Sequence, residues 1–212
     1  MLLAIDTSAG TAVAAVAANG SVLAERSTAD TRRHAEVIGP FLHEVLAEVD
    51  RAARDGGDAH PLAGVVTGIG PGPFTGLRVG IAAARAVAIA RGVPLVPVPS
   101  HDAVALKLVE GGVAAGRFCV VTDARRREVA VTEYSAALPV PRVVVPARLE
   151  LRLGFAPEEG VALYEVTEIP AAALAHVAAA RLAAGASFPD PQPLYLRAPD
   201  VTMPTGPKRV TS

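Results

Sequence analysis

Two carboxylates, Asp6 and Asp123, each end a short apolar run and are followed by small or polar residues. The runs read Leu2-Leu-Ala-Ile-Asp-Thr-Ser8 and Cys119-Val-Val-Thr-Asp-Ala-Arg125, a similarity that leaves an internal duplication open. Carboxylates at two strand ends could hold Mg²⁺ through water in a cleft between two halves of the chain. The alternative is that both form turns. Arg125–Arg127 favour this alternative, because arginines would pair with a carboxylate or a phosphate.

A loop rich in glycine and proline, Gly70-Pro-Gly-Pro-Phe-Thr-Gly-Leu-Arg78, precedes a helical pattern. Helix amino termini attract anions, so this loop could cradle a phosphate. The glycine spacing does not match the dinucleotide-binding fingerprint, however, and Leu77 stands where a P-loop has lysine. Pro71 and Pro73 also lack the backbone N–H groups that hold phosphate. A rigid turn that sets the next helix against a sheet is the favoured interpretation.

The five histidines are spaced unfavourably for a metal site. His34 and His43 are nine residues apart, which points them to opposite sides of a helix. Ser100-His101-Asp102 has the residue types of a serine protease, but consecutive side chains diverge and cannot form the relay of a catalytic triad. We therefore expect neither a metal site nor hydrolase chemistry.

The elements that would position these residues follow from hydrophobic pattern and turn signals. Asn19-Gly20 predicts a hairpin between two strands. In the first half we expect strands at 2–6, 11–18, 21–27, 64–69 and 94–98, a helix at 34–49 that includes Pro40, and a helix capped by Thr75 and ending near Arg91. In the second half we expect helices at 101–110 and 170–184, strands at 117–122, 128–135, 140–145 and 161–164, and a proline-punctuated tail at 188–212. Residues 149–169 are otherwise unassigned. The order predicts a mixed α/β chain with domains at 1–100 and 101–212.

The helix predicted at 34–49 carries a broad apolar stripe: Val37, Ile38, Phe41, Leu42, Val45, Leu46 and Val49. The second helix is small and apolar over most of its surface, with Leu77 and Ile81 near its start. By default such a stripe faces its own sheet. A helix layer that is apolar on both sides could also offer its outer side to a partner subunit. The pattern leaves both interpretations open.

Composition excludes several classes of protein. The 212 residues include 20 basic and 21 acidic side chains, and the net charge of −1 argues against a constitutive nucleic-acid binder. Cys119 is the single cysteine, which excludes an intrachain disulfide and a cysteine-based zinc site. The amino terminus lacks the basic region of a signal peptide, and the Asn19-Gly20 turn interrupts the uncharged stretch 7–24. We therefore expect a cytoplasmic protein without a membrane span.

Motifs along nearly the whole chain together resemble those of the TsaB (YeaZ) family: Ile5-Asp-Thr-Ser8, Arg33-His-Ala-Glu36, the 70–78 loop, Val98-Pro-Ser100, Asp123-Ala-Arg-Arg-Arg-Glu128 and Tyr195-Leu-Arg197. The 70–78 string is the most specific of them. The resemblance implies a duplicated RNase H-like fold of the actin-like ATPase (ASKHA) class, with two small mixed-sheet domains. It also implies a part in forming N6-threonylcarbamoyladenosine at position 37 of tRNAs that read ANN codons.

In that pathway TsaC makes threonylcarbamoyl-adenylate, and TsaD transfers the threonylcarbamoyl group to adenine. The resemblance implies that this chain is a non-catalytic partner of TsaD and that TsaE joins them in a larger complex. Two departures from TsaD support a lost active site. His34 matches the first of two metal-binding histidines in TsaD, but Ile38 stands at the second, and Asp123-Ala-Arg-Arg replaces a Gly-Gly turn.

The same resemblance gives expectations for individual residues. Asp6, Thr7, Ser8 and Asp123 would be remnants of phosphate-binding loops, with no cofactor or metal bound. The interface with TsaD would lie at Val37, Ile38, Phe41, Leu42, Val45, Leu46, Leu77 and Ile81. Without TsaD, the same face would form a homodimer, because exposed apolar area tends to be covered.

Two further hypotheses accompany this one. Arg125–Arg127 and Lys208-Arg209 could touch tRNA phosphates, although the isolated chain should bind tRNA weakly because its net charge is near zero. The alternative function is an enzyme of the same fold. It would be an ATP-dependent acyltransferase that uses Asp6, Thr7, Ser8 and Asp123, or a glycopeptidase-like protein, for which the sequence offers no nucleophile–base pair.

Overall fold

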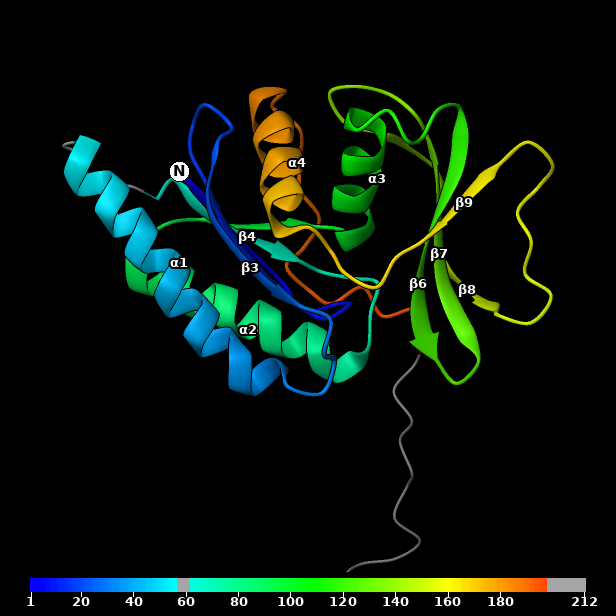
Figure 1. The fold of residues 1–212 in the computed structure, drawn as a ribbon, viewed down its shortest axis with the longest axis horizontal. Coiled ribbons are helices and arrows are strands. Elements are labelled where there is room, and N and C mark those ends of the chain that lie inside the picture. Colours follow the sequence, from blue (N-terminus) through cyan, green and yellow to red (C-terminus); the bar gives the residue numbers. More distant parts are fainter. Residues whose placement is uncertain (57–61, 198–212) are drawn as a thin grey trace, which may run out of the picture.

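The first of two β-sheets is built almost entirely from the amino-terminal half of the chain (Figure 1). A computed structural model describes residues 1–56 and 62–197. The five strands follow the order β3-β2-β1-β4-β5, with bounds β1 Leu2–Asp6, β2 Thr11–Val16, β3 Val22–Thr28, β4 Gly64–Gly68 and β5 Leu95–Val98. β2 is antiparallel to β1 and β3, whereas β4 is parallel to β1 and β5. The predicted hairpin at Asn19-Gly20 is confirmed.

The second sheet repeats the first with different residues. Its order is β8-β7-β6-β9, with bounds β6 Arg117–Arg125, β7 Glu128–Ser135, β8 Arg142–Leu151 and β9 Ala162–Glu165. β7 is antiparallel to β6 and β8, and β9 is parallel to β6. This is the order and direction of β3-β2-β1-β4. The repeat places Asp6 of β1 and Asp123 of β6 on equivalent strands, as expected of a duplicated fold.

Four helices form two layers (Figure 1). α1 (His34–Gly56) and α2 (Phe74–Arg91) lie side by side on one face of the first sheet, and α3 (Ser100–Glu110) and α4 (Ala171–Ala183) lie between the sheets. Side chains alternate along β1, so Leu3 and Ile5 join the core under α1, while Ala4 joins the core around α3 and α4. α4 therefore covers the first sheet although it comes from the end of the chain. The predicted boundary after residue 100 falls at the first residue of α3. The division into two domains stays a prediction.

The core between the sheets combines small helix residues with a few large side chains. Ala171, Ala172, Ala173 and Ala175 of α4 are buried, and their small size lets the helix approach the first sheet closely. Phe118 and Tyr134 of the second sheet stack with ring centroids 5.7 Å apart in the same core. In the described part of the chain, no helix combines the length and the hydropathy needed to cross a bilayer.

α1 and α2 differ from their predicted bounds at one end each. α1 runs through Pro40 and continues to Gly56 rather than ending at residue 49. Its added part is held by the ion pair between Asp50 and Arg91 of α2, with a closest N–O distance of 2.9 Å. α2 begins at Phe74, and its N-cap residue is Pro73, which makes no side-chain cap bond. The prediction of Thr75 as the cap was therefore wrong.

The second half also differs in detail. β8 extends to Leu151, beyond its predicted end at 145, because it pairs with β7 along most of its length. The stretch 149–169, otherwise unassigned from sequence, contains the end of β8 and all of β9. The last residues of the predicted tail, including Lys208 and Arg209, lie outside the described residues.

Buried polar side chains at the start of α3 bind the second sheet and α4. His101 is fully buried, and its Nδ1 and Nε2 lie 2.8 and 2.9 Å from the hydroxyl oxygens of Thr132 and Thr122. The neighbouring Asp102 accepts hydrogen bonds of 2.6 Å from the Tyr134 hydroxyl and from the Arg181 guanidinium of α4. The start of α3 thus joins β6, β7 and α4.

The buried imidazole of His101 should make stability depend on pH. Burial lowers the pKa of His101 from 6.5 to about 3, so the ring is neutral in the folded protein but protonates in the unfolded chain below about pH 6.5. The unfolded state then binds more protons, and the free energy of unfolding falls as pH decreases. We expect the stability advantage of the native protein over His101→Gln to shrink by up to about 1.4 kcal/mol per pH unit between about pH 6.5 and 3.

Urea unfolding of both proteins at several pH values between 7.5 and 4.5 measures this difference. Burial also raises the pKa values of Asp6 and Asp102, but both carboxyls are present in both proteins. A difference in unfolding free energy that stays constant across the range would contradict the assignment to His101.

Candidate functional site

The carboxylate at the end of β1 is buried and fully engaged. Asp6 is 1% exposed, and its Oδ1 accepts hydrogen bonds of 2.7 Å from the backbone N–H and the hydroxyl of Ser8. Its Oδ2 accepts a hydrogen bond of 2.5 Å from Ser100 at the start of α3, and the Ser100 hydroxyl accepts one from the Gly70 N–H. Burial raises the pKa of Asp6, opposed by the hydrogen bonds from Ser100 and Ser8. Asp6 therefore joins three segments of the fold.

The glycine loop and the start of α2 pack directly on residues 6–8. A Cβ at Gly72 would lie 2.7 Å from the Ser8 carbonyl oxygen, and one at Gly80 would lie 2.2 Å from the Thr7 hydroxyl oxygen. That hydroxyl donates to the Gly76 carbonyl at 2.6 Å. The glycines thus bring α2 against the loop that follows β1. This agrees with the interpretation of the 70–78 segment as a rigid turn.

Asp123 lies in a different environment from Asp6. Its side chain is 63% exposed and pairs with Arg152 at 3.1 Å, and no hydrogen bond or ion pair among the described residues joins it to Asp6. Arg125, Arg126 and Arg127 follow with φ angles of 61°, 53° and 65°. The left-handed conformation costs an L-residue about 1–2 kcal/mol. The three arginines therefore adopt a left-handed backbone conformation that glycine adopts more easily. The sequence has these arginines where the resemblance to TsaD implies a Gly-Gly turn.

His34 and Ile38 of α1 are the positions that the resemblance matches to the two metal-binding histidines of TsaD. His34 is buried at the start of α1, and its Nδ1 lies 2.9 Å from the Thr11 hydroxyl oxygen. Burial lowers the pKa of His34. Ile38, one turn further along α1, packs in the core of the first sheet. In the described part of the chain, no group of three or more histidine, cysteine, aspartate or glutamate side chains is placed to hold a metal ion.

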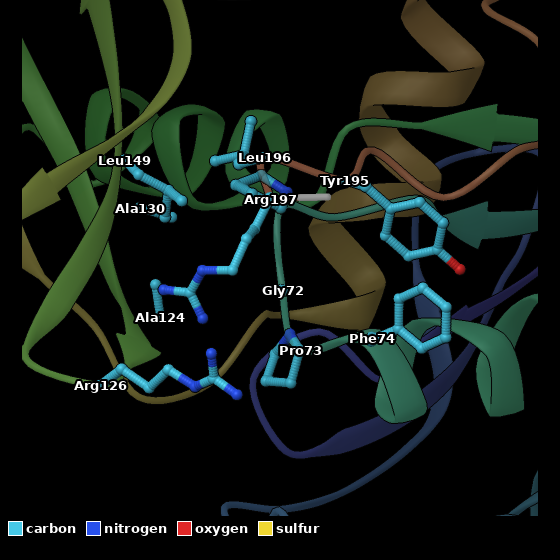
Figure 2. A pocket seen from close by; sticks show the side chains of 11 residues that line it. Gly72, Pro73, Phe74, Ala124, Arg126, Ala130, Leu149, Tyr195, Leu196 and Arg197 are labelled. Atoms are coloured by element: carbon cyan, nitrogen blue, oxygen red, sulfur yellow. The ribbon is translucent and has the colours of Figure 1, made fainter. Parts of the chain in front are cut away.

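Two sequence motifs meet at a pocket between the sheets (Figure 2). Its volume is about 330 Å³, and three segments line it: the glycine loop at 71–74, the second sheet at Ala124, Arg126, Ala130 and Leu149, and the carboxyl-terminal segment Tyr195–Arg197. Phe74 and Tyr195 stack at 4.6 Å between ring centroids, and the Arg78 guanidinium lies 3.7 Å from the Phe74 ring centroid. The Arg78 Nε also donates a hydrogen bond of 2.9 Å to the Tyr195 hydroxyl.

The carboxyl-terminal segment ties the two halves together at this pocket. Tyr195 holds it to α2, and Arg197 forms an ion pair with Glu128 of β7. The 70–78 loop and Tyr195-Leu-Arg197 are both family-like motifs, but the sequence did not predict that they are in contact. One sequence feature pointed to this contact: aromatic residues are only 4% of the chain, and each of the two motifs contains one, Phe74 and Tyr195.

The residues predicted for a partner interface divide into two groups. Ile38, Val45, Leu77 and Ile81 are buried within the chain. Val37, Phe41, Leu42 and Leu46 are half-buried on α1. On α2, Ile89 is 75% exposed, and Ala82 and Ala86 are exposed on the preceding turns. We call Val37, Phe41, Leu42, Leu46, Ala82, Ala86 and Ile89 the α1–α2 face.

The contact between Gly68 and Asp6 gives a stability test. A Cβ at Gly68 would lie 1.8 Å from the Asp6 Oδ2 and 2.8 Å from the Ser100 hydroxyl oxygen. Because both atoms are buried and hydrogen-bonded, we expect Gly68→Ala to lower the free energy of unfolding by about 1–3 kcal/mol or more. Gly39→Ala is the matched control, since a Cβ there meets nothing within 4 Å on the exposed side of α1. Because Pro40 follows, the Cβ gains helix propensity but crowds the proline ring, so we expect a change of stability within about 1 kcal/mol. Equal effects of the two variants in chemical denaturation would contradict this account.

Comparison with known proteins agrees with this architecture. A family model described as "TsaD: tRNA N6-adenosine threonylcarbamoyltransferase" matches residues 21–138, more than half of the chain. An uncharacterized protein of Mycobacterium tuberculosis is 39% identical over 211 residues, covering 94% of this chain and 92% of that protein. The tRNA threonylcarbamoyladenosine biosynthesis protein TsaB of Bacillus subtilis is 31% identical over 145 residues, covering 68% of this chain and 59% of that protein.

A solved structure shares the whole fold. YeaZ from Pseudomonas aeruginosa superposes with a TM-score of 0.72 at 22% sequence identity, covering 92% of this chain and 99% of that one. The prediction of a duplicated α/β fold of the actin-like class is thereby confirmed. From the family match, the relatives and the repeated sheet together, we conclude that the chain belongs to the TsaB (YeaZ) family.

Proposed function

We propose that this chain supports formation of N6-threonylcarbamoyladenosine in tRNA by binding TsaD, and that it does not itself transfer the threonylcarbamoyl group. Family membership supports a role in making this modification. The observation that carries the non-catalytic part is the state of Asp6. It is buried, hydrogen-bonded by Ser8 and Ser100, and covered by the glycine loop.

The other expected remnants of phosphate loops also serve the fold. Thr7 donates its hydroxyl hydrogen to Gly76 and is 1% exposed. Ser8 donates twice to Asp6. Asp123 pairs with Arg152 in the second sheet. These contacts leave the carboxylate of Asp6 without a free oxygen that faces solvent, which supports a structural use of the ancestral residues.

The α1–α2 face supports the partnership with TsaD. Ile38 and Val45 pack on the first sheet, and the half-buried Phe41, Leu42 and Leu46 pack against the same core. The apolar side chains of the layer that are most open to a partner are therefore those of Ala82, Ala86 and Ile89 on α2. Ile89 is 75% exposed and follows the exposed Ala82 and Ala86 at helical spacing, so the three side chains form an apolar patch on α2. Stable interfaces bury about 1,600 Å² in total, an area that two helices of this length can supply.

The family match suggests how the two proteins would pair. Because TsaD's own family model matches residues 21–138, TsaD should carry the equivalents of α1 and α2. Two similar helix layers could then face one another across a pseudo-twofold axis, as identical subunits do across a true one. The same geometry would allow this chain to form a homodimer alone. TsaE would join the heterodimer as a third subunit.

An ATP-dependent acyltransferase is the alternative function, and a glycopeptidase-like enzyme is a further one. Both require accessible reactive groups, and the contacts of Asp6, Thr7 and Ser8 favour neither. Formation of the modified nucleoside can be measured with purified TsaC, TsaD, TsaE and tRNA, with and without this chain. We expect modification to need both TsaD and this chain. ATP turnover by this chain alone with Mg²⁺ would contradict the proposal.

Ile89 gives the sharpest test of the face. Leu42 and Leu46 are half-buried, so charges there would also disturb the core, whereas Ile89→Arg should leave the fold intact. We expect Ile89→Arg to weaken binding to TsaD about tenfold or more in calorimetry, because a charge must be desolvated at an apolar contact. Leu138→Arg is the matched control, since Leu138 is 66% exposed and lies outside α1 and α2. If both variants bind TsaD as the native chain does, the assigned face is wrong.

A further inference from the structure

Two neighbouring pockets form one cleft between the halves of the molecule. The first is the pocket of about 330 Å³ under the carboxyl-terminal segment (Figure 2). The second, of about 480 Å³, is lined by residues 31–35 except Arg33, by Pro73–Gly76 and Val79, and by Arg125. Pro73 and Phe74 line both pockets, so the two adjoin at the glycine loop. We call the two together the cleft.

The walls of the cleft carry a concentration of positive charge. Arg126 and Arg197 line the first pocket, Arg32 and Arg125 line the second, and no aspartate or glutamate lines either one. The chain as a whole has a net charge of −1, so this grouping is local. Figure 2 shows the side chains of Arg126 and Arg197 extending toward one another within the first pocket.

Carboxylates lie beside two of the four arginines, Arg197 and Arg32. Glu128 pairs with Arg197, and Asp123 pairs with Arg152, which lines neither pocket. Asp30 lies 3.8 Å from an exposed Arg32. The Arg125 guanidinium donates a hydrogen bond of 3.0 Å to the Thr31 hydroxyl, a neutral partner that leaves its charge available to an anion.

Backbone N–H groups and a histidine ring face the second pocket. α2 begins there, with no acidic residue in its first turn and no side-chain cap bond, so its first N–H groups and its dipole favour an anion. His34 is 7% exposed and lines the same pocket. Its Nδ1 is bonded to Thr11, and its Nε2 lies beside Gly76 at the start of α2 without a hydrogen bond in the described part of the chain.

From this arrangement, we propose that the cleft binds a phosphate-bearing ligand, with Arg125, His34 and the start of α2 around one phosphate and Arg126 and Arg197 nearby. Guanidinium groups suit phosphate because they form paired, charge-assisted hydrogen bonds. Here side chains supply the donors that glycine backbone supplies in a phosphate loop. The phosphate can belong to the RNA backbone or to a free phosphate compound, and the inference does not depend on the pairing with TsaD.

The turn of the β6–β7 hairpin offers a matched pair of variants. Arg125 and Arg127 have φ angles of 61° and 65°, so glycine relieves the left-handed backbone at either position and both variants should fold. Arg125→Gly removes a guanidinium from the cleft. Arg127→Gly removes a guanidinium that belongs to the same turn but lines neither pocket. Thermal unfolding checks that both remain as stable as the native chain.

Calorimetry on the full chain, with pyrophosphate and separately with a tRNA anticodon stem-loop, tests the proposal. We expect binding of at least one probe, weakened about tenfold or more by Arg125→Gly and unchanged by Arg127→Gly. If the stem-loop binds and pyrophosphate displaces it, the phosphate in the cleft belongs to RNA. If pyrophosphate binds and the stem-loop does not, the phosphate belongs to a free compound. Failure of both probes to bind, or affinity that Arg125→Gly leaves unchanged or that both variants weaken equally, would overturn the proposal.

Discussion

A buried carboxylate must be satisfied by hydrogen bonds, and at Asp6 this requirement fixes the relative positions of three segments. Ser8 supplies two donors from its own loop, and Ser100 supplies the third from the start of α3. Ser100 in turn accepts a hydrogen bond from Gly70, so the glycine loop is held at the same point. The residues after Ser100 then extend the constraint to the other half: His101 meets Thr122 and Thr132, and Asp102 meets Tyr134 and Arg181.

The cluster of Ser100, His101 and Asp102 shows how the same residue types can serve catalysis or architecture. Consecutive side chains point in different directions, and here each reaches a different element. The buried and hydrogen-bonded Asp6 supports our proposal that residues of the ancestral site now serve the core. Under our proposals, the surfaces that serve function are the α1–α2 face, which would bind a protein partner, and the cleft, which would bind phosphate.

Local patterns predicted much of this fold. The Asn19-Gly20 hairpin, the apolar stripe of α1 and the repeated strand–carboxylate segments are all readable from neighbouring residues. What the sequence could not give depends on contacts between distant residues. The extension of α1 depends on the ion pair between Asp50 and Arg91. The position of the carboxyl-terminal segment depends on the contacts of Tyr195 with Phe74 and Arg78. The division of the apolar stripe into buried Ile38 and Val45 and half-buried Phe41 and Leu42 likewise follows from where the sheet lies.

The position of α4 has a consequence for synthesis of the protein. One face of the first sheet is covered by α4, Ala171–Ala183, which the ribosome makes only after both sheets. Nascent chains that end before this helix therefore expose Ala4, Val66 and their apolar neighbours. During translation, that sheet is a natural substrate for chaperones that hold hydrophobic segments, and premature termination yields fragments suited to proteolysis rather than to assembly.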